Sequence, residues 1–390
     1  MAAWPVAALY GAQFLVIGMA MPLLPVWLAA RGLQPAAIGQ VLAAQSLARM
    51  IAQPLIARLA DASGRLRAVM LACAALAMLI SAWLGAEAQG FWPILLGVAA
   101  GWFFFSPLVP LTEVLAVRVG DRLGVAYGRM RLWGSLTFIA GAMLAGLLLD
   151  VWPAAMLIWA VAAAQALTLL AVALQREGEE PESESAEQEK STETSGGWKE
   201  LLKPGFMLFL LVAGLVQASH ALLYGFAALH WQKQGFSGVT IGLLVTVGVL
   251  AEVVLFWHSA RWQEQAGAAR LLMLAAALAT LRWLGMAADP PLAVLFALQL
   301  LHAFTFGAAH LGAIAFIRTR APRQLAATAQ SVYSSISMGL FMMLAMWGAG
   351  RLYEVHGARA WLAMAAMAAL AVPLAWLLRR LMPARAADAA

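Results

Sequence analysis

The chain contains few charged residues. Only 11% of its 390 residues are Asp, Glu, Lys or Arg, whereas 63% are hydrophobic, and the mean hydropathy is +0.82. Soluble domains carry roughly 25% charged residues, which keep their surfaces hydrated. The shortage of charge therefore excludes an ordinary water-soluble protein and places the chain in a lipid bilayer.

The chain also lacks the combinations of residues on which catalysis and metal binding depend. Its one cysteine, Cys73, excludes an internal disulfide, a zinc site of several cysteines and a CxxC redox pair. We find no set of nucleophile, base and oxyanion donors, no nucleotide-binding glycine loop and no cluster of metal ligands. The sequence therefore predicts neither an enzyme nor a protein that holds a metal or a cofactor.

What the chain has instead is a series of apolar runs, each about 20 residues long, the length that crosses a hydrocarbon core of about 30 Å. The first run has no charged segment before it and no clear cleavage signal, so we interpret it as a retained helix. The sequence predicts an all-α membrane protein with twelve transmembrane helices, over residues 4–30, 36–57, 66–86, 91–117, 130–149, 153–175, 205–230, 238–259, 268–288, 291–317, 326–350 and 358–379.

An acidic, serine-rich stretch between residues 176 and 197 divides the chain into halves of similar length. Its apolar content is too low for a packed core and its like charges repel, so we expect a solvated tether. Six helices, a long loop and six more helices are the layout of transporters built from two pseudo-equivalent bundles. The predicted domains are an N-terminal six-helix bundle (1–175), an acidic cytoplasmic linker (176–203) and a C-terminal six-helix bundle (204–390).

The formal net charge of +6 reflects membrane topology and does not indicate a nucleic-acid partner. With a cytoplasmic N-terminus, the inner loops and the C-terminal tail hold most of the arginines and lysines, and the outer loops hold only Arg31, Lys233, Arg351 and Arg359. The positive-inside rule predicts this asymmetry for a protein with both termini in the cytoplasm.

The loop after the second span reads Ala57-Arg-Leu-Ala-Asp-Ala-Ser-Gly-Arg-Leu-Arg67. It resembles the loop signature of the major facilitator superfamily, Gly-x-x-x-Asp-x-x-Gly-Arg-x-Arg/Lys, at Asp61, Gly64, Arg65 and Arg67, and departs from it at Ala57. Gly64 permits a turn, and the arginines stay at the anionic inner leaflet. The resemblance implies that this loop is a gating motif. The alternative is that its arginines only mark the cytoplasmic end of a span, as the positive-inside rule predicts.

Longer segments resemble the 3-phenylpropionate transporter branch of this superfamily, which is related to lactose and nucleoside proton symporters. The resemblance runs over essentially the whole chain outside the acidic stretch. It implies a multi-pass protein of the bacterial inner membrane, which we expect to be a monomer. The segments that carry it are residues 103–113, 127–135, 220–226, 251–254, 281–283, 301–302 and 309–311.

Ionisable side chains at the centre of a membrane helix cost at least about 2.5–3.5 kcal/mol, so each predicts a partner or a function. Glu113 lies in the fourth span, and Arg129 and Arg131 open the fifth. A pair of Glu113 with one of these arginines would hold the carboxylate ionised and could present a guanidinium to an anionic substrate. By resemblance to lactose-type symporters, Glu113 and Arg131 are candidates for substrate binding, and an inner-gate salt bridge is the alternative.

Three further residues are candidates for proton coupling or substrate binding. Glu252, in the eighth span, has no basic residue close in sequence, and desolvation favours the protonated form of a carboxylate. His302, in the tenth span, can change its charge near physiological pH. The lactose-type symporters place an arginine on the ninth helix and a histidine on the tenth, which by resemblance makes Arg282 a substrate-binding candidate. Structural hydrogen bonds are the alternative for Glu252 and His302, and Glu113 is a further candidate for coupling.

Polar residues recur every four positions in the second span, at Gln45, Arg49 and Gln53, and so form one stripe. We expect this stripe to face a cavity, where Gln45 and Arg49 would bind a substrate carboxylate. The alternative is that Arg49 pairs with Asp61 or Glu113 and only joins helices.

Together these residues predict a secondary active transporter that takes up a small organic anion with protons by alternating access. The resemblance favours 3-phenylpropionate, and Tyr224 is one of several aromatic residues that could stack on its ring. The predicted partners are the substrate, protons and the lipid bilayer. The alternatives are a sugar or nucleoside proton symporter of the same fold, a receptor that binds ligand without transport, and a lipid scramblase.

Overall fold

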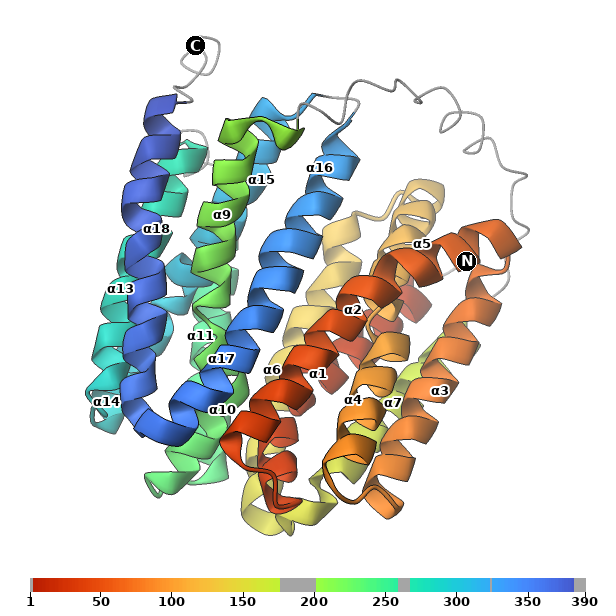
Figure 1. The fold of residues 1–390 in the computed structure, drawn as a ribbon. Coiled ribbons are helices and arrows are strands. Elements are labelled where there is room, and N and C mark those ends of the chain that lie inside the picture. The colour runs from red at the N-terminus through yellow and green to blue at the C-terminus, as the bar shows by residue number, and fades with distance from the viewer. Residues whose placement is uncertain (1–2, 176–200, 259–266, 323–324, 382–390) are drawn as a thin grey trace. The chain divides into compact units, whose positions relative to one another are not determined.

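The computed structural model describes residues 3–175, 201–258, 267–322 and 325–381, and these residues form helices joined by short connections, without a strand (Figure 1). Residues 176–200 of the predicted acidic linker lie outside the described part. The helices before the linker are α1 (Trp4–Ala30), α2 (Pro35–Ser63), α3 (Leu66–Ala86), α4 (Phe91–Phe105), α5 (Leu108–Leu123), α6 (Tyr127–Val151), the short η1 (Ala154–Met156) and α7 (Leu157–Ala173).

The helices after the linker include two π-helical segments, η3 and η5, which interrupt the tenth and eleventh predicted spans. In order, the elements are α9 (Pro204–Ala218), α10 (Ala221–Lys233), α11 (Gly238–Trp257), α13 (Ala268–Ala287), α14 (Leu292–Leu300), η3 (Ala303–Ala308), α15 (Ala309–Arg320), α16 (Ala326–Tyr333), η5 (Ser334–Leu340), α17 (Phe341–His356), η6 (Gly357–Ala360) and α18 (Trp361–Leu381).

Ten stretches of the described residues are long and apolar enough to cross a membrane. Helix α2 is not among them because its polar residues lower its hydropathy, although its 29 residues suffice for a crossing. The last stretch, Thr328–Leu381, spans 54 residues and contains both α17 and α18, which run in opposite directions (Figure 1). Gly357, between them, has a φ of 56°. If α2 is added to the ten stretches and the last stretch is divided into two crossings, the described helices give the twelve predicted crossings.

Contacts divide the chain into two compact units whose boundaries do not follow the linker. The first unit comprises Met1–Glu180, Leu223–Thr246 and Met346–Val355, and the second comprises Pro181–Leu222, Val247–Ala345 and His356–Ala390. Nearly all of α10, the first part of α11 and most of α17 therefore pack with the N-terminal helices. The division into an N-terminal and a C-terminal bundle stays a prediction.

In the first unit, α1 packs closely on α6. A Cβ atom at Gly141 of α6 would lie 2.7 Å from the backbone oxygen of Leu15, so only glycine permits this approach. Small residues at such crossings are the usual basis of helix packing in membranes.

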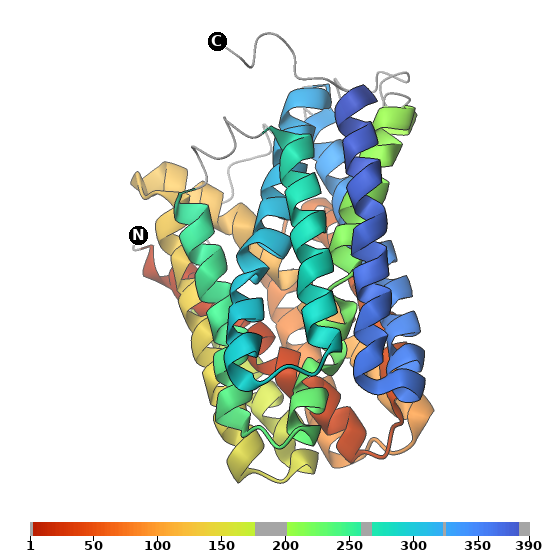
Figure 2. The ribbon, with the colours of Figure 1, turned by 90° about the vertical axis from the view of Figure 1, so that its left-hand side faces the viewer.

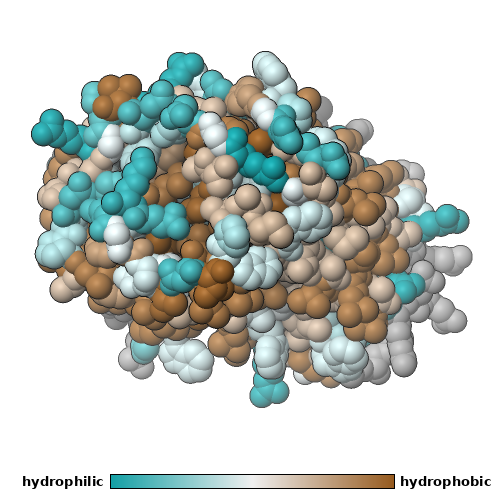
Figure 3. All heavy atoms as spheres, turned by 90° about the horizontal axis from the view of Figure 1, so that it is seen from below, coloured by the Kyte–Doolittle hydropathy of each residue, from teal (hydrophilic) through white to brown (hydrophobic). Residues whose placement is uncertain are grey.

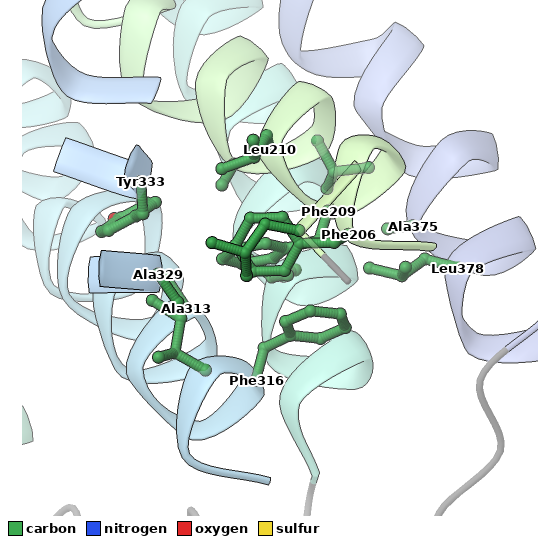
Figure 4. Close-up of a cluster of buried hydrophobic side chains, with 14 residues drawn as sticks. Phe206, Phe209, Leu210, Ala313, Phe316, Ala329, Tyr333, Ala375 and Leu378 are labelled. Carbon is green, nitrogen blue, oxygen red and sulfur yellow. The ribbon is translucent and has the colours of Figure 1, made fainter. Parts of the chain in front are cut away.

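In the second unit, α18 lies between α9 and α13 (Figure 2). A hydrophobic cluster at one end of this unit joins α9, α15, α16 and α18 (Figure 4). The rings of Phe209 and Phe316 stack there with centroids 4.2 Å apart, and Tyr333 packs beside Phe209. Leu272 of α13, the helix that carries Arg282, also belongs to this cluster.

The molecular surface is largely apolar, as the membrane prediction requires. On α2, the side chains of Leu47, Ile51, Leu55 and Leu59 are exposed and recur every four residues, so they form one apolar face. Figure 3 looks onto one end of the molecule, where hydrophilic side chains (teal) gather among hydrophobic ones (brown).

Candidate functional site

A buried polar network lies within the second unit, centred on Arg282 of α13. The Arg282 side chain is fully buried. Its Nη2 donates to Gln299 Oε1 of α14 at 2.7 Å, and its Nη1 donates to Thr305 Oγ1 of η3 at 2.9 Å. Nη1 also lies 3.1 Å from His302 Nδ1. Three neighbouring turns of the tenth span therefore surround one guanidinium.

The network continues to His220, which lies at the break between α9 and α10. His220 is fully buried, with Nδ1 3.1 Å from the backbone oxygen of Val216 and Nε2 3.1 Å from Thr305 Oγ1. A carbonyl oxygen only accepts hydrogen bonds, so Nδ1 carries the proton and Nε2 of the neutral ring accepts from the Thr305 hydroxyl. The Thr305 oxygen is then oriented to accept from Arg282.

The same reasoning assigns the proton of His302. A guanidinium only donates, so His302 Nδ1 accepts from Arg282 and the proton of the neutral ring lies on Nε2. That nitrogen is 3.6 Å from Glu252 Oε2 of α11. A Cβ atom at Gly307 would lie 2.9 Å from Leu255 Cδ2 and 3.5 Å from Glu252 Cγ, so this glycine permits the close approach of α11. The structure thus joins Glu252, which the sequence predicts on its own, to Arg282 and His302, which the resemblance to lactose-type symporters predicts together.

Aromatic side chains enclose the network. The Trp283 ring lies 4.6 Å from the Arg282 guanidinium and meets the His220 ring edge-on at 5.0 Å. Its Nε1 donates to Ser219 Oγ at 3.0 Å, and Trp361 of α18 stacks on it at 5.3 Å. Cation–π contact and hydrogen bonding therefore hold the guanidinium in place.

The sequence interpretation did not assign His220, Gln299 and Thr305 to the site. Gln299, His302 and Thr305 recur every three residues, and this spacing within an apolar span is the signal that was available. No comparable signal links His220 to them, because it is 85 positions from Thr305.

The polar stripe of α2 lies in the first unit. Arg49 is exposed although it is about 14 residues, or about 21 Å, from either end of this helix. It is two residues, or about 200° around the helix, from Leu47 and Ile51 of the apolar face. Helix α2 therefore exposes an apolar face and, opposite to it, a face that carries Gln45 and Arg49. A guanidinium at this depth is costly in lipid, so the cavity at this face stays a prediction.

Glu113 and Arg131 also lie in the first unit, on α5 and α6. The charge of Arg131 acts on Glu113, but no described residue forms a salt bridge with Glu113 within 4 Å, so the expected close pair with Arg129 or Arg131 is absent. The Arg131 guanidinium instead lies over the Phe14 ring, 4.1 Å from its centroid, because α1 presents an aromatic face at this crossing. Beside it, Gln13 Nε2 donates to Thr112 Oγ1 at 2.7 Å, a buried pair that the sequence interpretation missed.

The predicted gating motif forms the connection between α2 and α3. Gly64 ends α2 with φ of 63°, a left-handed conformation that favours glycine. The Arg65 backbone N–H donates to Ser63 Oγ at 3.3 Å. Arg67 Nη2 donates to the Ala173 oxygen at the end of α7, where a cation is favourable, at 2.9 Å. Asp61 is exposed.

Two carboxylates at span ends cap other helices of the first unit. Asp150, near the end of α6, accepts from the first N–H groups of α11, Gly238 N at 2.6 Å and Val239 N at 3.0 Å. Glu354, near the end of α17, accepts from Ala36 N in the first turn of α2 at 2.8 Å. The first N–H groups of a helix have no partner within the helix and favour negative charge.

Glycines bring the capped helices together. A Cβ atom at Gly39 of α2 would lie 2.8 Å from the Cα atom of Gly350 in α17, and one at Gly242 of α11 would lie 2.8 Å from the Ala142 oxygen of α6. Each capping carboxylate therefore joins two helices that also cross at close distance. Tyr224, the predicted aromatic contact, is a partly buried residue of α10 in this unit.

Comparison with known proteins gives consistent matches over almost the whole chain. Residues 3–363 match the MFS_1 like family. A probable 3-phenylpropionic acid transporter of Escherichia coli (strain K12) is 34% identical over 354 residues, which cover 89% of this chain and 90% of that protein. A maltose permease of Geobacillus stearothermophilus is 29% identical over 84% of this chain and 82% of that protein.

Solved transporter structures share the fold. The nucleoside transporter NupG superposes with a TM-score of 0.81 over 98% of this chain and 99% of that chain, at 15% identity. A D-xylose-proton symporter superposes with a TM-score of 0.69 over 96% and 95%, at 14% identity. These likenesses confirm the predicted helical transporter fold.

Proposed function

We propose that the chain, which belongs to the major facilitator superfamily of membrane transporters, takes up a small organic anion together with protons by alternating access. Membership of this family confirms the prediction that the protein is a multi-pass membrane transporter and not an enzyme. The observation that carries the finer proposal is the series of buried Arg282, buried His302 and partly buried Glu252, which combines a permanent cation with two groups able to hold a proton.

The substrate class follows from Arg282 and Arg49. A guanidinium binds a carboxylate through two parallel hydrogen bonds, and the binding is strong where water is excluded. The 34% identical relative named for 3-phenylpropionic acid supports an aromatic monocarboxylate. The exposed Arg49 would attract the anion, and Arg282 would bind it.

The contacts of His302 support one way in which a proton and an anion would be coupled. His302 Nδ1 has one lone pair, which faces Arg282. A proton taken up at Nδ1 would displace the Arg282 N–H and place two cations side by side, so Arg282 would turn toward an incoming carboxylate. Glu252, 3.6 Å from Nε2, would hold the coupled proton or stabilise the imidazolium.

Alternating access requires that one side of the transporter close while the other opens. We assign the Asp150 and Glu354 caps to the gate on the outer side, because the positive-inside rule places their helix ends there. Breaking both caps would open that gate. The same rule supports cytoplasmic termini in a bacterial inner membrane, and Asp61, Gly64, Arg65 and Arg67 remain candidates for the inner gate.

Counterflow in proteoliposomes tests the proposal. Labelled 3-phenylpropionate, lactose and uridine are offered to the wild type and to Arg282→Gln, with protein levels matched. We expect counterflow of 3-phenylpropionate alone, and its loss in Arg282→Gln. Counterflow of lactose or uridine would favour a sugar or nucleoside symporter, and binding without counterflow would favour a receptor.

A further inference from the structure

A groove of about 660 Å³ lies between α1, α6 and α7, apart from the polar network and within the first unit. Its floor consists of small residues of α1, including Ala8, Gly11 and Ala12. Small residues in a membrane helix normally permit close packing of another helix. Thr137 of α6 lies against Gly11, but Ala8 is exposed and Ala12 is half-buried, so this face of α1 is open to another occupant beside α6.

The walls of the groove belong to the lipid-facing surface. Trp133 of α6 and Leu170 of α7 are 54% and 56% exposed, and both line the groove. Side chains of this kind face acyl chains in a bilayer. Water would solvate such walls poorly, so a hydrocarbon chain is the chemically suitable occupant.

One charged side chain lines the groove, and it lies at one end of the groove. Arg129, in the first turn of α6, is the single ionisable residue among those that line it, and Trp4, the first residue of α1, lines the same end. The bond from Gln175 Nε2 to the Pro5 oxygen, 2.8 Å long, places the end of α7 at the same level. Tryptophan and arginine at a helix end are typical of the lipid headgroup region.

We propose that this groove binds one anionic phospholipid of the inner leaflet. An acyl chain lies on the small residues of α1, and the phosphate accepts hydrogen bonds from the exposed Arg129 guanidinium. Basic pockets between transmembrane helices on the cytoplasmic side bind anionic headgroups in this way. The proposal rests on the membrane location of the chain and on the proposed cytoplasmic side of its termini, and it is independent of the transported substrate.

Native mass spectrometry of the purified full chain, titrated with phosphatidylglycerol or phosphatidylethanolamine, tests this site. We expect the wild type to retain one phosphatidylglycerol and to prefer it over phosphatidylethanolamine. Arg129→Gln should weaken phosphatidylglycerol binding roughly 10-fold or more, since a charged hydrogen bond is lost. Ala8→Leu should weaken binding of both lipids, because the longer side chain occupies the floor.

Arg118→Gln is the matched control, since Arg118 is an exposed arginine of α5 outside the groove, and it should bind lipid like the wild type. Arg129→Lys keeps the charge and should retain the preference for phosphatidylglycerol, which separates charge from folding. Equal binding of the two lipids by the wild type, or unchanged binding in Arg129→Gln, would overturn the site. A lipid-free dimer that Ala8→Leu dissociates would assign the groove to a second copy of the chain.

Discussion

The two carboxylate caps make a quantitative prediction about gating. Asp150→Asn keeps one oxygen as an acceptor for the first turn of α11 but removes the negative charge, and Glu354→Gln does the same at α2. Each change weakens a contact that, in the proposed mechanism, is made only while the gate is closed. We therefore expect both substitutions to raise the population of the open gate.

The magnitude follows from the exposure of the caps. A negative charge at an exposed helix N-terminus contributes about 0.3–1 kcal/mol, since solvent screens it. Loss of about 1 kcal/mol raises the ratio of open to closed gates about 5-fold. The two caps join different helix pairs and share no partner, so their effects should add. The double variant should then lose about 2 kcal/mol, or roughly 30-fold in the ratio.

Cysteine labelling measures this ratio. Leu42 lies one turn beyond Gly39 in α2, is 6% exposed, and packs at Gly225 of α10. In a Cys73→Ala background, the labelling rate of Leu42→Cys by a membrane-impermeant maleimide should follow the open population. We expect about 5-fold faster labelling for Asp150→Asn and roughly 30-fold for the double variant. Asp121→Asn removes an exposed carboxylate that caps no helix and should leave the rate unchanged.

The reasoning would be refuted by a double variant that is labelled at the wild-type rate while it remains folded by size-exclusion chromatography. The caps would then form when the gate closes but would not stabilise the closed state. Equal acceleration by Asp121→Asn would show that net charge, and not the caps, sets the rate.

Three further predictions concern the polar network. Arg282→Lys should lose at least about 10-fold in uptake at unchanged protein level, because an ammonium cannot contact Gln299 and Thr305 from two fixed nitrogens; uptake near the wild-type rate would show that charge alone suffices. Glu252→Gln or His302→Gln, whichever residue carries the proton, should retain substrate exchange but lose accumulation driven by a pH gradient; accumulation by both variants would exclude these two carriers. Thr305→Val removes the hydroxyl between Arg282 and His220 and should reduce uptake about 5-fold or more, whereas Thr305→Ser should restore it; a serine variant as poor as the valine variant would point to packing.

The membrane class and the helices were predictable from the sequence because they depend on local quantities. The length of an apolar run relative to the bilayer determines a crossing, so the predicted spans 4–30 and 66–86 coincide with α1 and α3. The turn at Gly64 was predictable for a similar reason, since glycine adopts a left-handed conformation without strain. The polar stripe of α2 follows from helical periodicity alone.

The partners of the polar residues were not predictable, because they depend on which helices pack together and in which register. His220 meets Thr305 across 85 positions, and Asp150 meets Gly238 across 88. The prediction of a close pair between Glu113 and Arg131 was wrong for the same reason, since packing of α6 on α1 directs Arg131 toward Phe14. Sequence alone determines which side chains must avoid lipid, since burial of charge in hydrocarbon is costly everywhere. Tertiary structure decides which of them form a site, because a hydrogen bond requires atoms about 3 Å apart and hydrophobicity does not specify that distance.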